Sequence, residues 1–204
     1  RQNATQYFFT VPAEDLETAL MIESLRMSGL LGSEDSWSLE RGAMLQEVAR
    51  NLSIPEYVFY TRLREILFQG TPYEQDALGT KASLEKTTAG MLREFHRTWY
   101  TPANAVLVVA GDVDLQGTLE LARRLFGTIP SREPPGRPAV VLQPVNPQTI
   151  RLETDRPYGS VVLAWRMPGF RDPDHAASLV LSEAMNNRRG RLYSLVTKGV
   201  ALDA

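Results

Sequence analysis

Two glutamates in the first third of the chain, Glu40 and Glu47, are the first residues whose type and spacing could do chemistry. They lie in segment 37–48, which is predicted to be helical, with Ser36 or Ser38 as its N-cap. A helix turns by about 100° per residue, so seven residues return to within about 20° of the starting direction and both carboxylates share one face. Paired carboxylates on one face are a candidate site, although a solvent-exposed acidic stripe is the commoner arrangement.

Few other side chains in the chain could complete such a site. Cysteine is absent, so there is neither a disulfide framework nor a thiolate metal site. The two histidines are His96, expected on the surface of a helix, and His175, expected at a helix start. Carboxylates without imidazoles make a poor zinc site. We therefore expect these residues alone to bind no zinc tightly.

The composition is that of an ordinary globular protein. Of 204 residues, 43% are hydrophobic and 23% are charged, which is enough to build a real core. A net charge of −2 gives no basic surface for nucleic acid. No apolar run approaches the roughly 20 residues of a membrane span. Because the chain begins without Met, in strand-like sequence, we expect both of its ends to be cut, so a missing signal peptide says nothing about the parent protein.

Hydrophobic periodicity predicts the elements that would hold these residues. Amphipathic helices are expected at about 15–28, from the Ser36 or Ser38 cap to 52, and at 56–68. Further helices are expected from a Ser83 or Thr87 cap to 99, at 115–126 and at 174–186, with a last one starting near 192. Strands are expected at 6–11, 105–111, 149–154 and 159–166. No Gly-rich loop follows any of these strands, so nucleotide binding has no support. The pattern predicts an α+β fold, a two-layer sandwich with helices on one face of a sheet.

A Pro-rich and charged stretch at 130–138 divides the chain. Such a composition is typical of an extended, exposed linker. We therefore predict the C-terminal part of a first domain at 1–130, a linker at 131–148 and, at 149–204, the beginning of a second domain of the same kind. The strand–strand–helix pattern after the linker supports this prediction.

Several ordered motifs resemble the pitrilysin/insulinase family of zinc peptidases, known as M16. The segment Glu40-Arg-Gly-Ala-Met-Leu-Gln-Glu47 is similar to the family's E-R-x-V-V-x-x-E helix. The segment from Trp99 to Asp112 is similar to its W-Y-x-P-x-N-A-x-L-V-V-x-G-D stretch, which is long and specific. Weaker similarities extend the resemblance over nearly the whole chain: Pro12 to Leu20, Thr71-Pro-Tyr73 with Leu78-Gly-Thr80, Phe126 to Pro130, Arg191-Leu-Tyr193 and Lys198 to Ala201.

The resemblance implies the two-layer α/β sandwich of the M16 metallopeptidases and a zinc-dependent reaction. The family uses an inverted motif, H-x-x-E-H, for two His ligands and a general base, and a later Glu as third ligand, leaving one position for the attacking water. Glu47 matches that third ligand, and Glu40 would support it by charge or hydrogen bonding. The motif H-x-x-E-H is absent here and is expected upstream of Arg1 in the parent protein.

Two functions follow from the resemblance. The first is a zinc endopeptidase that hydrolyses extended or unfolded peptides, bound as an added edge strand. The second is a catalytically silent M16-like subunit that pairs with an active partner or scaffolds a complex; the fragment could also self-associate. In the family's second domain an Arg/Tyr pair can contact substrate, but the local match is poor and Arg191 and Tyr193 are interpreted as structural. The compartment is not assigned; bacterial relatives weakly favour the periplasm or another extracytoplasmic location.

Overall fold

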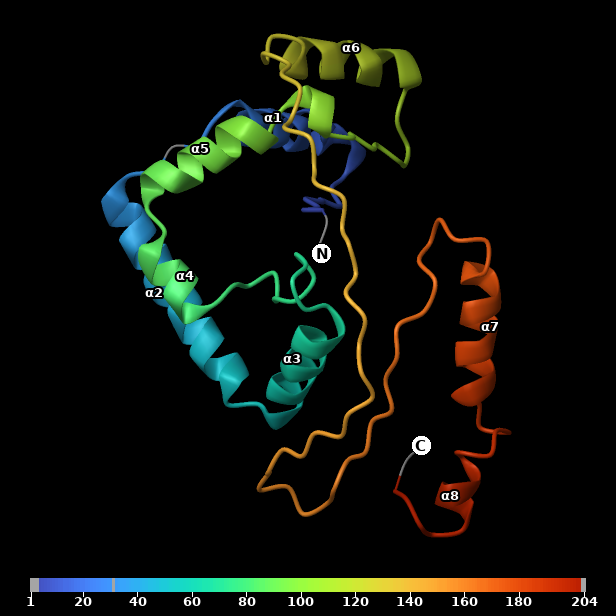
Figure 1. The fold of residues 1–204 in the computed structure, drawn as a ribbon. Coiled ribbons are helices and arrows are strands. Elements are labelled where there is room, and N and C mark those ends of the chain that lie inside the picture. Colours follow the sequence, from blue (N-terminus) through green and yellow to red (C-terminus); the bar gives the residue numbers. More distant parts are fainter. Residues whose placement is uncertain (1–3, 31, 203–204) are drawn as a thin grey trace. The chain divides into compact units, whose positions relative to one another are not determined.

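The computed structural model describes residues 4–30 and 32–202. The chain divides between Thr154 and Asp155 into two compact units. Figure 1 follows the chain through helices joined by long extended stretches. The outermost ends of the predicted domains, residues 1–3 and 203–204, lie outside the described residues.

The predicted helices are all present. The first unit contains two short 3-10 helices, η1 (Ala13–Asp15) and η2 (Pro102–Asn104), and the α-helices α1 (Leu16–Ser28), α2 (Glu34–Leu52), α3 (Pro55–Leu67), α4 (Lys81–Lys86), α5 (Ala89–Trp99) and α6 (Leu115–Phe126). The start of α2 is earlier than predicted, because Ser33 rather than Ser36 or Ser38 is its N-cap. The Ser33 hydroxyl accepts a hydrogen bond from the Ser36 N–H at 3.1 Å.

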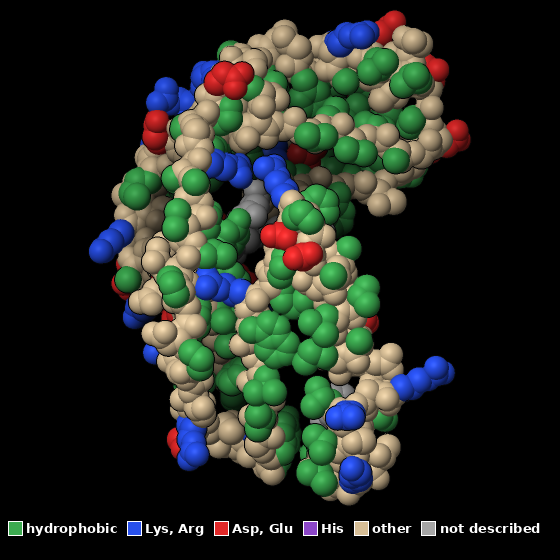
Figure 2. Space-filling view, turned by 45° about the vertical axis from the view of Figure 1, so that its right-hand side comes forward, with side chains coloured by type: hydrophobic (Ala, Val, Ile, Leu, Met, Phe, Trp, Pro, Cys, Tyr) green, Lys and Arg blue, Asp and Glu red, His purple; other side chains and the backbone are tan. Residues whose placement is uncertain are grey.

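The core of the first unit lies where α2 meets α4 and α5. Trp37 and Val48 of α2 are buried with Leu84 of α4 and Ala89 of α5. In addition, α2 packs against α3, and α1 packs against α6 (Figure 1). The buried cluster is small, and many large hydrophobic side chains remain exposed over the visible face (Figure 2).

The predicted α+β sandwich is wrong for this structure, because no β-strand is present among the described residues. The segments predicted as strands are irregular and extended instead. Residues 106–110 make no backbone–backbone hydrogen bond with any described residue. Val106 and Val108 are 88% and 78% exposed, although both lie in the apolar run that was predicted as the strand 105–111.

The predicted strands do not form because an apolar or alternating sequence favours an extended backbone but does not supply a partner strand. A strand also needs a neighbour whose N–H and C=O groups lie opposite its own in register. The extended segments in the described part of the chain do not pair with one another, so no sheet forms to bury their side chains.

The second unit contains α7 (His175–Met185) and α8 (Ser194–Thr197). Both match predicted helices. The predicted strand 159–166 of this unit, like 149–154 at the end of the first unit, does not form a strand. Among the helices that the structure describes, none combines the length and apolarity needed to cross a membrane.

Candidate functional site

Helix α2 presents the two candidate carboxylates on its exposed side. Glu40 and Glu47 are both exposed, while Trp37 and Val48 on the adjacent side of the helix are buried. At about 100° per residue, the directions of Glu40 and Glu47 differ by about 20°, as the spacing predicted. Between them lies Ala43, whose small side chain is also exposed.

The rotation of α2 is fixed by contacts with the α4–α5 junction. The Trp37 indole N–H donates a hydrogen bond to the Thr87 carbonyl at 2.7 Å. The Glu34 carboxylate accepts one from the backbone N–H of Ala89, at the start of α5, at 3.0 Å. Such a carboxylate satisfies an N–H that has no partner within its own helix. These contacts hold the buried side of α2 inward and therefore keep the Glu40–Glu47 face outward.

Neither glutamate forms a strong ion pair with a described residue. The side chain of Glu47 is 49% exposed, and its nearest cation is the Arg50 guanidinium, 3.9 Å away. An exposed pair at this distance contributes little to stability. The Glu40 carboxylate has neither an ion pair nor a hydrogen bond with any residue that the structure describes. Both carboxylates are therefore accessible to a ligand or to another polypeptide segment.

The two histidines are used elsewhere. His96 lies on α5, where its Nε2 is 2.7 Å from the Arg26 carbonyl at the C-terminal end of α1. His175 belongs to the second unit, and its Nδ1 is 3.1 Å from the Pro168 carbonyl. In the described part of the chain, no three His, Cys, Asp or Glu side chains lie together as a metal site. Among these described residues, Glu40 and Glu47 have ligand chemistry but belong to no group of three such side chains.

Arg191 and Tyr193 take part in the local turn that leads into α8. The Arg191 carbonyl accepts a hydrogen bond from the Ser194 hydroxyl at 2.6 Å. The Tyr193 carbonyl accepts one from the Val196 N–H at 3.0 Å. Arg191 is exposed and Tyr193 is half-buried.

A polar cluster that the sequence did not predict joins the N-terminal segment, α1 and α5. The hydroxyls of Tyr7 and Tyr100 are hydrogen-bonded at 2.5 Å. The Arg26 guanidinium lies over the Tyr7 ring, 4.1 Å from its centroid, and His96 stacks on Tyr100 at 4.4 Å. Glu23 of α1 forms an ion pair with Arg26 at 3.4 Å. Local sequence patterns do not predict this cluster, since Tyr7 and Tyr100 are far apart along the chain.

We expect this cluster to make the protein less stable at high pH. Burial, followed by the hydrogen bond with Tyr7, raises the pKa of Tyr100 from 10.0 to about 12. Because the folded state holds this proton more tightly than the unfolded state does, the contribution to stability is complete below pH 10. It is lost as the pH rises towards about 12. Urea unfolding at a series of alkaline pH values measures this loss.

A tyrosine variant tests the cause of the shift. Tyr7→Phe removes the hydrogen bond but leaves most of the burial, so the pKa of Tyr100 should fall and yet remain above 10. Ultraviolet absorbance of ionised tyrosine follows the titration. The control Tyr60→Phe removes an exposed tyrosine of α3 and should leave the Tyr100 titration in place. An unchanged titration in Tyr7→Phe would show that the Tyr7–Tyr100 bond does not contribute to the shift.

Comparison with known proteins shows which protein family this chain matches. Residues 86–202 match the family model described as the Peptidase M16 inactive domain. The zinc protease PqqE of Helicobacter pylori is 24% identical over 186 residues, which cover 89% of this chain and 42% of that protein. Subunit 1 of the human mitochondrial cytochrome b-c1 complex is 27% identical over 175 residues, which cover 85% of this chain and 36% of that protein.

A solved structure shows the same relationship at the level of fold. The crystal structure of a protease from Helicobacter pylori has a TM-score of 0.59 and 24% identity, covering 65% of this chain and 32% of that one. The present chain thus spans less than half the length of the curated relatives that it matches.

Proposed function

Because this chain belongs to the M16 peptidase family, we propose that it is part of a zinc-dependent endopeptidase that hydrolyses extended or unfolded peptides. The observation that carries the proposal is the exposed face of α2, on which Glu40 and Glu47 have the spacing of the family's E-R-x-V-V-x-x-E helix. The zinc protease PqqE supports it as a relative over most of the chain. The 204 residues taken alone are proposed to be inactive.

In this proposal the chain contributes one zinc ligand, Glu47, and a supporting carboxylate, Glu40. The half-exposed Glu47 side chain forms a weak ion pair with Arg50 among the described residues, so it can turn towards a metal ion. Glu40, one heptad earlier, adds negative charge beside it. The imidazole ligands and the general base are proposed to come from residues outside this chain. We also propose that residues 131–148 link two domains of the same kind.

A second candidate is a catalytically silent subunit of a larger complex. The matching family model is described as an inactive domain, and one relative is a subunit of the cytochrome b-c1 complex. For such a protein, Glu40 and Glu47 would be no more than a solvated helix face. The two candidates differ in whether the full-length protein holds zinc and cleaves peptides.

The deciding experiment measures zinc in the full-length protein. We expect about one zinc per polypeptide by mass spectrometry of metals, because three protein ligands suffice for a catalytic site. Cleavage of an unfolded, dye-labelled protein should stop when a chelator removes the metal and resume when zinc is returned. A well-folded full-length protein with neither zinc nor cleavage would overturn the peptidase proposal and leave the silent subunit.

A further inference from the structure

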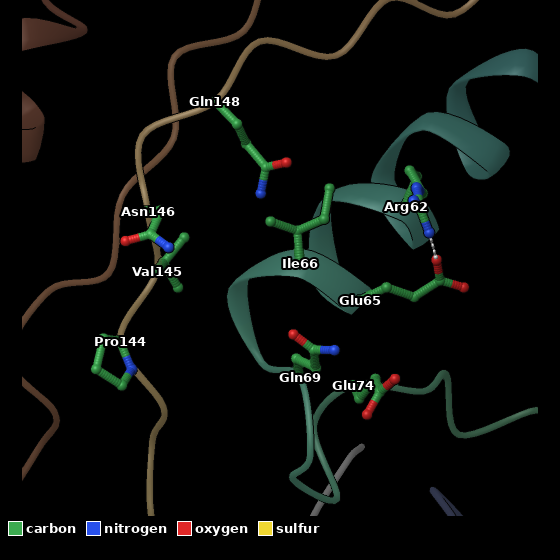
Figure 3. A pocket seen from close by; sticks show the side chains of 9 residues that line it. All are labelled: Arg62, Glu65, Ile66, Gln69, Glu74, Pro144, Val145, Asn146 and Gln148. Carbon is green, nitrogen blue, oxygen red and sulfur yellow. Dashed lines mark hydrogen bonds and ion pairs between the residues drawn. The ribbon is translucent and has the colours of Figure 1, made fainter.

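A hollow of about 420 Å³ lies in the first unit between α3 and the extended segment 144–148. Its volume is within the range of about 300–1,000 Å³ that is common for ligand sites. Figure 3 shows the helix side chains on one side and the extended segment on the other, with Ile66 and Gln148 directed towards each other. None of the family motifs found in the sequence includes its lining residues.

The extended wall of this hollow is stiffened by proline. Pro144 and Pro147 have fixed φ angles and no N–H, so they hold the segment extended and prevent it from joining a sheet as a central strand. Val145 between them is half-buried and lines the hollow. With Ile66 of α3, it provides an apolar surface against which an aliphatic chain can pack.

Polar groups without partners surround this apolar surface. The side-chain amides of Gln69, Asn146 and Gln148 line the hollow and make no hydrogen bond with any described residue. Each amide offers one acceptor oxygen and two donor hydrogens. Such a lining disfavours a wholly apolar ligand, because the ligand would cover polar groups that it cannot satisfy.

The hollow also carries one uncompensated negative charge. Glu65 is neutralised by Arg62, whose Nη1 lies 2.8 Å from the carboxylate (Figure 3). Glu74 accepts a hydrogen bond from the Gly70 N–H at 2.8 Å, and no ion pair with a described residue balances its charge. An anion would be repelled here, whereas a cation would be attracted.

We propose that this hollow binds a basic side chain of an extended peptide, arginine in particular. The aliphatic stem would pack on Ile66 and Val145 and place the charged head at Glu74, as long basic side chains do where an apolar surface meets a polar edge. A guanidinium has five donors, enough for the carboxylate and neighbouring amide oxygens together. The inference rests on the proposed function, because it assigns the peptide substrate a second contact with the protein.

Peptide binding to the present chain tests this inference without catalysis. The probe is a short fluorescein-labelled peptide of serine, threonine and alanine with one central arginine. Its partner peptide carries citrulline, which has the same shape without the charge. At low ionic strength we expect the arginine peptide to bind about fivefold more tightly by fluorescence anisotropy, which is the scale of one partly exposed ion pair. Added salt should reduce the difference.

Two variants with the same change of net charge locate the site. Glu74→Gln keeps an oxygen that can accept from Gly70 but loses the charge, so the preference for arginine should disappear. Glu85→Gln on α4 removes an exposed carboxylate that does not line the hollow and should preserve the preference. Equal binding of both peptides by the unmodified chain, or equal effects of the two variants, would overturn the inference. Since no cleavage is measured, neither result depends on whether the parent protein is an active peptidase.

Discussion

Replacing Glu47 with glutamine in the full-length protein should lower its zinc affinity and its peptidase activity by about 100-fold or more. Loss of a residue that merely supports a metal ligand costs about 10- to 100-fold, so loss of a ligand should cost at least the upper value. Glutamine has nearly the same shape but replaces an anionic oxygen with a neutral amide. The change should not disturb α2, because the Glu47 side chain is half exposed and its ion pair with Arg50 is long, at 3.9 Å.

Competition with a coloured zinc chelator measures the affinity, and circular dichroism checks that α2 is intact. Glu40→Gln should have a smaller effect, of about 10- to 100-fold, as expected for a supporting carboxylate. Glu85→Gln is the matched control, since it removes an exposed carboxylate of α4 and should leave zinc binding unchanged. Full zinc affinity in Glu47→Gln would show that Glu47 is not a ligand and would favour the solvated helix face.

Replacing Trp37 with alanine should lower the free energy of unfolding of the first unit by about 3–5 kcal/mol. The Trp37 side chain is 8% exposed and lies in the buried cluster with Val48, Leu84 and Ala89. Its removal would leave a cavity and would also take away the hydrogen bond to the Thr87 carbonyl. Because the buried cluster is small, few other contacts can compensate. Urea unfolding followed by circular dichroism measures the change.

Two further variants keep this prediction testable even if Trp37→Ala does not fold. Trp37→Phe retains much of the buried ring but loses the indole N–H, so it should cost less than Trp37→Ala. Leu39→Ala removes a large apolar side chain from the same helix where it is 80% exposed, and should change stability by no more than about 0.5 kcal/mol. Similar losses for Leu39→Ala and Trp37→Ala would show that the cluster around Trp37 does not anchor α2.

The sequence by itself determined the helices, because their signals are local. The amphipathic pattern, the proline at the start of α3 and the acidic first turns act within a few residues, so most helices were predictable from their own segments. The separate short helix α4 before α5 was not predicted. The shared direction of Glu40 and Glu47 follows from helix geometry alone. Even there, the cap was placed wrongly, because Ser33, Ser36 and Ser38 offer similar side chains and only the folded turn selects Ser33.

Only the tertiary structure decided that the described extended segments stay unpaired, and which distant segments come into contact. The run 105–111 has the composition of a buried strand, yet its residues 106–110 pair with no described residue, because a ladder depends on a second segment that the run itself does not specify. The Tyr7–Tyr100 contact and the hollow between α3 and segment 144–148 likewise join residues far apart in sequence. Local propensity acts over one turn or one strand, whereas burial and pairing depend on where the rest of the chain lies.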